Sequence, residues 1–214
     1  MLNKGHFIVV EGLEGAGKST ALSTIQNYLR AYTKELIITR EPGGTHVGET
    51  ARRLLKESLP SEPLDARTEL LLLYASRVQL LEQVIRPALT RGCWVLGDRF
   101  ELSTWAYQGG GRKLDGDLIS HLSSFCLQGF KPDLIIFLDI SPEQGLKRAL
   151  RRGKADRIEQ ESLAFFKEVH MSYHEHIKTM ENVMVIDASQ PLQRVKESIC
   201  EALDVYIHKH SISL

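Results

Sequence analysis

Short runs of apolar residues alternate along the chain with longer stretches in which apolar residues recur at helical spacing. Five runs are short and almost continuously apolar, which is typical of strands covered on both faces of a sheet. These runs span Phe7–Val10, Leu36–Thr39, Trp94–Leu96, Leu134–Leu138 and Val183–Ile186. Strands that alternate with helices predict an α/β fold, with a five-stranded parallel sheet and helices on both faces.

Amphipathic stretches between these runs predict the helices. One stripe consists of Ala21, Leu22, Ile25, Tyr28, Leu29 and Tyr32, and another of Leu192, Val195, Ile199, Leu203 and Tyr206. A long helix is expected from about Leu64 to Arg91. Ser141-Pro142-Glu143-Gln144 has the features of a helix start, with a Ser cap and Pro at the first helical position. In such folds, ligands bind beyond the carboxyl ends of the strands.

The first apolar run leads into a glycine-rich segment that fits G-x-x-x-x-G-K-[ST] between a predicted strand and a predicted helix. Glycines let backbone N–H groups point inward around a phosphate, and the following helix adds the positive end of its dipole. Lys18 would reach the terminal phosphates of ATP, and Ser19 would place its hydroxyl on Mg²⁺. The expected ATP-binding residues are Gly12, Leu13, Glu14, Gly15, Ala16, Gly17, Lys18, Ser19 and Thr20.

This loop alone does not distinguish kinases from GTPases and ATPases. The Asn-Lys-x-Asp motif with which a GTPase reads its base does not occur in the sequence. A motor or transporter ATPase would need a longer chain. A small-molecule or nucleotide kinase of about 200 residues is the simplest interpretation.

Three further segments place polar residues where an acceptor should bind. Thr39–Thr45 follows the second run, and its Pro-Gly-Gly fixes a loop. Gly97–Gln108 follows the third run and begins with Asp98-Arg99. Tyr74-Ala75-Ser76-Arg77 places an arginine in an otherwise apolar part of the long helix. That arginine needs a partner or a ligand, because a buried unpaired charge is costly.

These segments resemble the thymidylate kinase family, nucleoside monophosphate kinases that make dTDP from dTMP and ATP. The resemblance covers essentially the whole chain and rests on Gly12–Thr20, Thr39–Thr45, Asp98–Gln108 and Asp156-Arg157-Ile158-Glu159, in the family's order and approximate spacing. It implies a P-loop kinase fold and a single nucleoside monophosphate kinase domain over residues 1–214. It also implies ATP:dTMP phosphotransferase activity in dTTP synthesis, Mg²⁺ with ATP, and a homodimer.

The resemblance implies roles for individual residues. Arg99 would grip the acceptor's 5′-phosphate with its guanidinium fork, and Arg52 would be a second phosphate contact. Arg77 would hydrogen-bond the thymine ring, Thr104 would face its N3 edge, and Tyr107 would crowd the 2′ position of the sugar. The implied dTMP-binding set is Arg52, Leu73, Arg77, Arg99, Ser103, Thr104, Tyr107 and Gln108, and the implied metal-binding residues are Ser19 and Asp98.

One position departs from the family's pattern. Four residues before the thymine-reading arginine the family usually has a Phe that stacks on the base, and this chain has Leu73. A leucine still covers a ring face by dispersion, but it loses the stacking geometry, which is worth about 1 kcal/mol.

Several residues have a second interpretation. Arg77 could be a structural salt-bridge partner, and Arg40 could pair with Glu41 or a surface acid instead of touching substrate. Asp139 ends an apolar run as Asp98 does, so the two compete for the metal. We favour Asp98 because an arginine and the acceptor motif follow it directly.

Six cations fall within eleven residues, namely Lys147, Arg148, Arg151, Arg152, Lys154 and Arg157. They could form a solvated helix end, where cations complement the helix dipole. Alternatively they form a lid over ATP at about residues 147–158, which supplies an arginine worth 10³-fold or more in rate. Family members with an acid in the phosphate loop, as at Glu14 here, keep their basic residues in the lid, and this kind is common among bacteria. We therefore expect Arg148, Arg152 and Arg157 to contact ATP. The expected catalytic residues are Lys18, Arg99, Arg152, Asp98 and Glu14, with Arg152 the first choice for the transition-state cation.

Composition excludes some classes of protein. In 214 residues, 27 Lys and Arg balance 27 Asp and Glu, which argues against a nucleic-acid-binding or anionic-membrane surface. No run approaches the roughly 18 apolar residues of a membrane span, and the N-terminal apolar stretch is too short for a signal peptide. The three cysteines match no metal-ligand spacing and suit a reducing compartment. We expect a cytoplasmic protein whose partners are ATP and dTMP.

Two alternative functions stay open. The chain could be a kinase for another small acceptor, such as a different nucleoside monophosphate. It could also be a non-catalytic switch that binds a nucleotide without turning it over, although Lys18, Ser19 and Arg99 argue against that.

Overall fold

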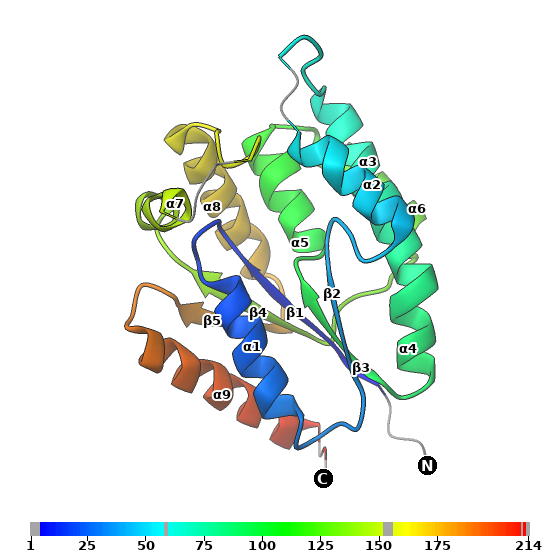
Figure 1. Ribbon diagram of the computed structural model, residues 1–214, viewed down its shortest axis with the longest axis vertical. Helices are drawn as coiled ribbons and strands as arrows, with labels where there is room; N and C mark the ends of the chain where they lie inside the picture. Colours follow the sequence, from blue (N-terminus) through cyan, green and yellow to red (C-terminus); the bar gives the residue numbers. More distant parts are fainter. Residues whose placement is uncertain (1–4, 58–59, 152–155, 211, 213–214) are drawn as a thin grey trace.

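The computed structural model describes residues 5–57, 60–151, 156–210 and 212 (Figure 1). The strands are β1 (Phe7–Gly12), β2 (Leu36–Arg40), β3 (Trp94–Asp98), β4 (Leu134–Asp139) and β5 (Val183–Asp187). The helices are α1 (Lys18–Leu29), α2 (His46–Lys56), α3 (Ala66–Leu80), α4 (Arg86–Thr90), α5 (Glu101–Thr104), α6 (Gly116–Leu127), α7 (Pro142–Leu150), α8 (Leu163–Ile177) and α9 (Leu192–Lys209), with π-helical segments η1 (Leu81–Ile85) and η2 (Trp105–Gly111).

The predicted five-stranded parallel sheet is confirmed. Its strand order is β2-β3-β1-β4-β5, and every neighbouring pair is parallel. Each strand continues one or two residues past its predicted end, because strand pairing extends into the charged or glycine residues that follow each run. The chain moves outward from β1 to one side and later returns to the other side, so β1 marks the topological switch point. Ligands bind at this position in open α/β sheets.

Alternating residues of β1 contribute to two different cores. Ile8 and Val10 pack in one cluster with Ile25 of α1, whereas Phe7 and Val9 pack in another with Ile85 of η1. Because successive side chains of a strand point to opposite faces, the sheet is covered on both sides. Helices α1 and α9 are packed side by side (Figure 1). The sheet is therefore a rigid base, and its carboxyl edge remains available for a site.

Three helix predictions need correction. Helix α1 ends at Leu29, so Tyr32 lies in the following turn, where its N–H donates to the Leu29 carbonyl oxygen at 2.9 Å. The long helix spans Ala66–Thr90 and contains η1, just before Pro87. Proline lacks an N–H and crowds the preceding turn, which explains the local loss of α-helical bonding. Leu192 belongs to the predicted stripe of α9, but it is exposed at the first position of the helix.

Caps define several helix starts. The predicted start at Ser141-Pro142 is confirmed, since the Ser141 hydroxyl accepts the Gln144 N–H and Pro142 is the first residue of α7. Of the predicted lid at 147–158, residues 147–150 belong to α7 and Arg157 lies in the turns that precede α8. Within the described residues, no helix combines the length and apolar character needed to cross a bilayer.

Candidate functional site

The glycine-rich loop turns tightly between β1 and α1. Gly15 has φ +75°, and a Cβ there would meet the Gly145 carbonyl oxygen at 2.0 Å, so only glycine fits. Gly17 has φ +95° and caps α1 without a side-chain hydrogen bond. The first N–H groups of α1 thus have no side-chain cap, as expected where a phosphate group completes the helix end. The side chains of Leu13 and Ala16 are buried in the core, so any contact from them to ATP would come from the backbone.

The Lys18 side chain folds back onto the glycine-rich loop. Its Nζ donates to the carbonyl oxygens of Gly12 and Leu13, at 3.1 and 2.8 Å. Burial, together with the nearby positive charge of Arg99, lowers the pKa of Lys18 to about 8. The neighbouring Ser19 is exposed and lines the cleft described below. This arrangement holds an ammonium group ready for an anion, since a bound phosphate would favour its charged form.

Arg99 follows directly after β3 in a conformation that is rare for a bulky residue. Its φ is +67°, in the left-handed region, and its N–H donates to the Val10 carbonyl oxygen at 3.0 Å. Such strain persists only where surrounding structure imposes it, and it is common at ligand sites. The turn directs the guanidinium toward the glycine-rich loop.

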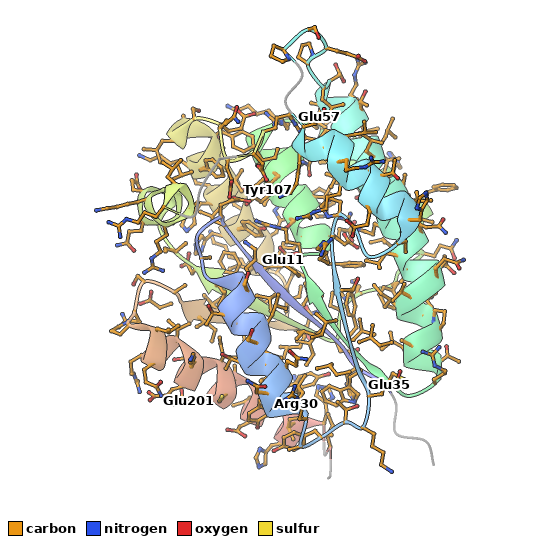
Figure 2. The ribbon with its side chains drawn as sticks, viewed as in Figure 1. Glu11, Arg30, Glu35, Glu57, Tyr107 and Glu201 are labelled. Carbon is orange, nitrogen blue, oxygen red and sulfur yellow. The ribbon has the colours of Figure 1, made fainter. Side chains whose placement is uncertain are left out.

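The Arg99 guanidinium links this loop to the acceptor motif. It donates to Glu14 Oε1 at 2.7 Å, to the Tyr107 hydroxyl at 3.1 Å and to Ser103 Oγ at 3.0 Å. The Tyr107 hydroxyl also donates to Glu14 Oε2 at 2.5 Å. Figure 2 labels Tyr107 in the helical segment that follows α5. Glu14 of the glycine-rich loop and three residues of the Asp98–Gln108 segment, predicted from two separate motifs, therefore meet at one point.

Glu11, at the end of β1, supports this group from below (Figure 2). Its carboxylate accepts from the Phe100 N–H at 2.8 Å, from Ser103 Oγ at 2.5 Å and from the Tyr173 hydroxyl at 3.0 Å. Burial raises the pKa of Glu11, opposed by the charge of Arg99 and by these hydrogen bonds. Glu11 was not predicted as a site residue. An acid placed directly between an apolar run and the glycine-rich loop was the available signal.

Arg77 lies almost completely buried in α3. Its Nε donates to Glu41 Oε2 at 2.6 Å, and its Nη2 donates to Thr104 Oγ1 at 2.9 Å and to the Phe100 carbonyl oxygen at 3.2 Å. Arg77 therefore has the salt-bridge partner that one interpretation required. It also lines the cleft, and its Nη1 has no hydrogen-bond partner among the described residues. The two interpretations are compatible.

A cleft of about 440 Å³ connects these groups, a volume in the range of small-molecule sites. Most of the predicted site residues line it. From the loop and α1 these are Glu14, Gly15, Gly17, Lys18, Ser19 and Thr20; from the acceptor side they are Arg52, Leu73, Arg77, Asp98, Arg99, Ser103, Thr104, Tyr107 and Gln108; from the basic segment they are Arg148 and Arg157. Arg40 is not among the lining residues and instead pairs with the surface acid Glu49 at 2.9 Å.

Another buried acid, Glu69, organises the far wall of the cleft. It accepts from Gln108 Nε2 at 2.6 Å and from Arg157 at 2.5 Å, and it pairs with Arg112 at 3.3 Å. Arg157 also donates to the Leu55 carbonyl oxygen. Glu69 and Arg112 were not predicted, because their partners lie some 40 to 90 residues away in sequence.

The described residues of the basic segment at 147–157 fit partly the solvated helix end and partly the lid over ATP. Lys147 and Arg148 lie in the last turn of α7, as a solvated helix end requires. Arg148 also lines the cleft and donates to the Ala188 carbonyl oxygen at 2.8 Å. Arg152 and Lys154 lie outside the described residues.

The two candidate metal-binding aspartates lie in different surroundings. Asp98 lines the cleft, and its Oδ1 is buried without a hydrogen-bond partner among the described residues. Asp139 is not a lining residue, and its carboxylate interacts with His170 and His174.

Comparison of the sequence with known proteins agrees with the geometry of the cleft. The family model described as thymidylate kinase matches residues 10–199. Two relatives named thymidylate kinase, from the Corby and Paris strains of Legionella pneumophila, are 55% and 54% identical to this chain. Each match covers 203 residues, which are 95% of this chain and 96% of the relative.

Proposed function

The chain belongs to the thymidylate kinase family, and we propose that its cleft transfers the γ-phosphoryl group of ATP to dTMP, giving dTDP and ADP. The observation that carries this proposal is the meeting of the glycine-rich loop and the Asp98-Arg99 motif in one cleft. An ammonium group, several guanidinium groups and exposed helix N–H groups surround a space that could hold two phosphorylated ligands.

The donor is held by the loop and the start of α1. Lys18 meets the terminal phosphates, and on binding it exchanges two carbonyl oxygens for phosphate oxygens. The backbone N–H groups around Gly15 and Gly17 cradle the phosphates. Arg148 supplies a further positive charge from α7.

Charged and neutral side chains together hold the acceptor. Arg99 and Arg52 bind its 5′-phosphate, and the thymine ring lies against Leu73 with Arg77 and Thr104 at its polar edge. The unpaired Nη1 of Arg77 supports this orientation, because a buried donor without a partner costs about 1–3 kcal/mol until a ligand satisfies it. Tyr107, held by Glu14 and Arg99, limits the space at the sugar. Gln108 and Ser103 complete the wall.

Transfer requires little beyond positioning and charge stabilisation. An oxygen of the acceptor phosphate forms a bond to the γ-phosphorus while the bond to the oxygen shared with the β-phosphate breaks, and ADP leaves. The acceptor oxygen is already ionised, so no strong general base is needed. Lys18 and Arg99 offset the charge on the transferred group, and closure over the cleft would exclude water and suppress ATP hydrolysis.

The residues at the cleft also suit Mg²⁺, which we include in the proposal. Asp98 offers a buried carboxylate oxygen without a partner among the described residues, and Ser19 offers an exposed hydroxyl. Oxygen donors are the ligands that Mg²⁺ prefers. When bound with ATP, Mg²⁺ would neutralise charge on the β- and γ-phosphates.

A homodimer is a further part of the proposal. Large apolar side chains are exposed on the neighbouring helices α3 and α6, namely Leu71, Leu118 and Phe125, the last 79% exposed. Light scattering should show a dimer that Phe125→Glu disrupts, whereas the control Val205→Glu, at an exposed site on α9, should leave it intact. A monomeric parent chain would exclude the dimer. We also propose a cytoplasmic location, which the three free thiols suit.

The decisive experiment measures ADP release with dTMP, dUMP, UMP, CMP, AMP and GMP as acceptors. Multiple turnovers with clear preference for dTMP are expected. Preference for another acceptor would assign the chain to a different kinase activity, and a single stoichiometric burst would indicate a nucleotide-binding switch. Arg77→Met should raise the KM for dTMP more than that for ATP, and the control Arg40→Met, outside the cleft, should change neither.

A further inference from the structure

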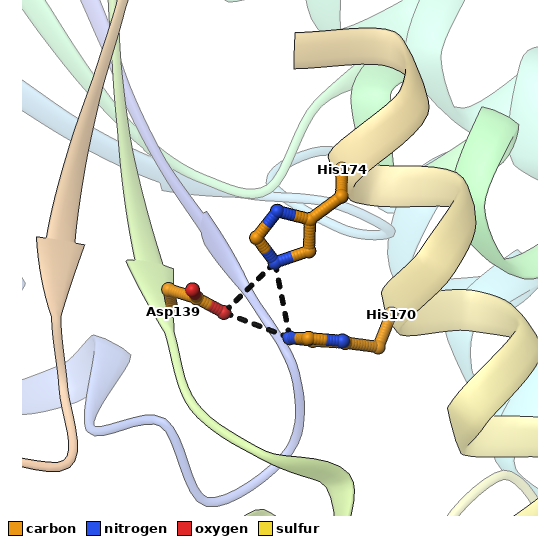
Figure 3. Close-up of side chains that lie close together, drawn as sticks. All are labelled: Asp139, His170 and His174. Carbon is orange, nitrogen blue, oxygen red and sulfur yellow. Dashed lines mark hydrogen bonds and ion pairs between the residues drawn. The ribbon is translucent and has the colours of Figure 1, made fainter. Parts of the chain in front are cut away.

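Three side chains of metal-binding types, one Asp and two His, meet where β4 ends beside α8, outside the cleft (Figure 3). His170 Nε2 lies 2.8 Å from Asp139 Oδ1, and His174 Nε2 lies 3.2 Å from the same oxygen. The two Nε2 atoms are 3.2 Å apart. Both rings point from α8 toward the carboxylate, so three donor atoms converge on one point (Figure 3).

These separations match the donor spacing of a metal site. With bonds of about 2.0–2.1 Å, donor atoms stand roughly 3.3 Å apart around a tetrahedral ion and about 3.0 Å apart around an octahedral one. Without an ion, two neutral imidazoles that both donate to Asp139 Oδ1 bring their N–H groups against each other. A single cation instead accepts a lone pair from all three atoms.

The three side chains are held in place before any ion binds. His170 and His174 are four residues apart on α8 and therefore share one face of the helix. Their helix is fixed between them by Tyr173, which is fully buried. The Asp139 carbonyl oxygen accepts the Ala188 N–H at 2.7 Å, which fixes the end of β4. A preformed site of this kind avoids much of the ordering that ligand binding otherwise requires.

The charge around the cluster suits a cation. Hydrogen bonds from His170 and the nearby His174 hold the pKa of Asp139 below its usual range, so its carboxylate is ionised. Glu143 of α7 interacts electrostatically with His170, and it pairs with Lys167 of α8 at 3.0 Å. The side chains of the cluster are 25–36% exposed, which leaves a path for an ion and room for water at the remaining position.

We propose that Asp139, His170 and His174 bind one divalent transition metal ion, of which Zn²⁺ is the representative, and that the ion fastens α8 to the end of β4. Imidazole donors suit Zn²⁺ and its neighbours, whereas Mg²⁺ prefers oxygen donors, so this site is distinct from the proposed Mg²⁺ site at the cleft. None of the three residues lines the cleft, so the role is structural.

The test uses the full chain, purified without a histidine tag, freed of metal with a chelator and kept free of nucleotide. Competition with a chromophoric chelator at pH 7.5 should show one tightly bound Zn²⁺ per chain that excess Mg²⁺ does not displace. At free Zn²⁺ about 100-fold above its Kd, the Tm should rise by about 5–10 °C.

Variants separate this site from adventitious binding. His170→Gln and His174→Gln should weaken Zn²⁺ binding by about 100-fold, and Asp139→Asn, which preserves shape, by at least about 10-fold. The control His121→Gln, exposed on α6, should bind as the parent chain does. At the same free Zn²⁺, Asp139→Asn should also lose at least about half of the Zn²⁺-dependent rise in Tm. The proposal is overturned if the parent chain binds no stoichiometric Zn²⁺, or if the cluster variants bind it as tightly as His121→Gln does.

Discussion

The buried Arg77–Glu41 pair allows a quantitative test of how the acceptor pocket is stabilised. Its two side chains are 1% and 3% exposed and lie 2.6 Å apart. Glu41→Leu preserves side-chain volume but leaves the Arg77 guanidinium without its countercharge. Removing one partner of a buried pair destabilises a protein by about 3–5 kcal/mol. For a chain of this size we expect the Tm to fall by about 6–20 °C.

A surface pair of the same chemistry provides the matched control. Arg40 and Glu49 lie 2.9 Å apart, but they are 51% and 44% exposed, so solvent screens their attraction. We expect Glu49→Leu to cost no more than about 1 kcal/mol, including the bond that Glu49 accepts from the Gly44 N–H. Urea denaturation of both variants, at equal protein concentration, gives the two free energies of unfolding directly.

The double variant Glu41→Leu/Arg77→Met separates stability from recognition. Replacing both members of a buried ion pair by apolar groups is often neutral or stabilising, so this protein should recover most of the lost free energy. Its KM for dTMP should stay above that of the parent chain, because the double variant lacks the Arg77 guanidinium that would contact the thymine ring. The reasoning is refuted if Glu41→Leu destabilises the chain no more than Glu49→Leu does, or if the double variant is as unstable as Glu41→Leu.

Further predictions concern the two substrates and the charge of Lys18. Because the pKa of Lys18 is lowered to about 8, the free enzyme loses this charge above pH 8, and its affinity for ATP should fall up to tenfold per pH unit in isothermal titration. Between about pH 8 and pH 10.5, Lys18 is protonated in the unfolded chain but largely deprotonated in the folded chain. Its contribution to the stability of the nucleotide-free chain should therefore rise with pH over this range. Lys18→Arg should flatten both dependences, and a flat profile in the parent chain would contradict the assigned pKa. Leu73→Phe should lower the Kd for dTMP by about fivefold, the equivalent of about 1 kcal/mol in ring stacking, and an unchanged Kd would mean that residue 73 does not cover the base. Arg152→Ala should lower kcat by 10³-fold or more with little change in dTMP affinity, and a kcat within about threefold of the parent would assign the transition-state role elsewhere.

The strands and the phosphate loop could be predicted because their signals are local. The strand Phe7–Gly12 is buried along its whole length, and its predicted part, Phe7–Val10, is apolar without alternation. The loop uses backbone N–H groups, and its pattern therefore fixes glycines at defined positions in one segment. The end of α1 at Leu29 was not predicted, because the apolar spacing continues to Tyr32. There the Tyr32 N–H donates to the Leu29 carbonyl oxygen, three residues back, as in a turn.

Side-chain partners could not be predicted in the same way. Glu11 meets Ser103 and Tyr173 across 92 and 162 residues, and nothing in the local sequence records either contact. The Asp139 cluster is a similar case, since Asp139 appeared only as a rival metal ligand and its histidines come from a helix 31 and 35 residues away. Such contacts depend on where the sheet order brings β4 and α8, which is known only once the chain has folded.

Arg77 shows how far the physical argument from sequence extends. An arginine among leucines requires either a countercharge or a ligand, because a guanidinium buried alone is too costly. From the sequence alone, the countercharge and the ligand were alternatives. A guanidinium has five N–H donors, however, and one carboxylate cannot satisfy all of them. Glu41 accepts from Nε, and Thr104 and the Phe100 carbonyl oxygen accept from Nη2. Nη1 has no partner among the described residues and lies at the cleft. The structural salt bridge is thus what allows the same arginine to be held, charged and buried, where a pyrimidine base can accept its remaining hydrogen bond.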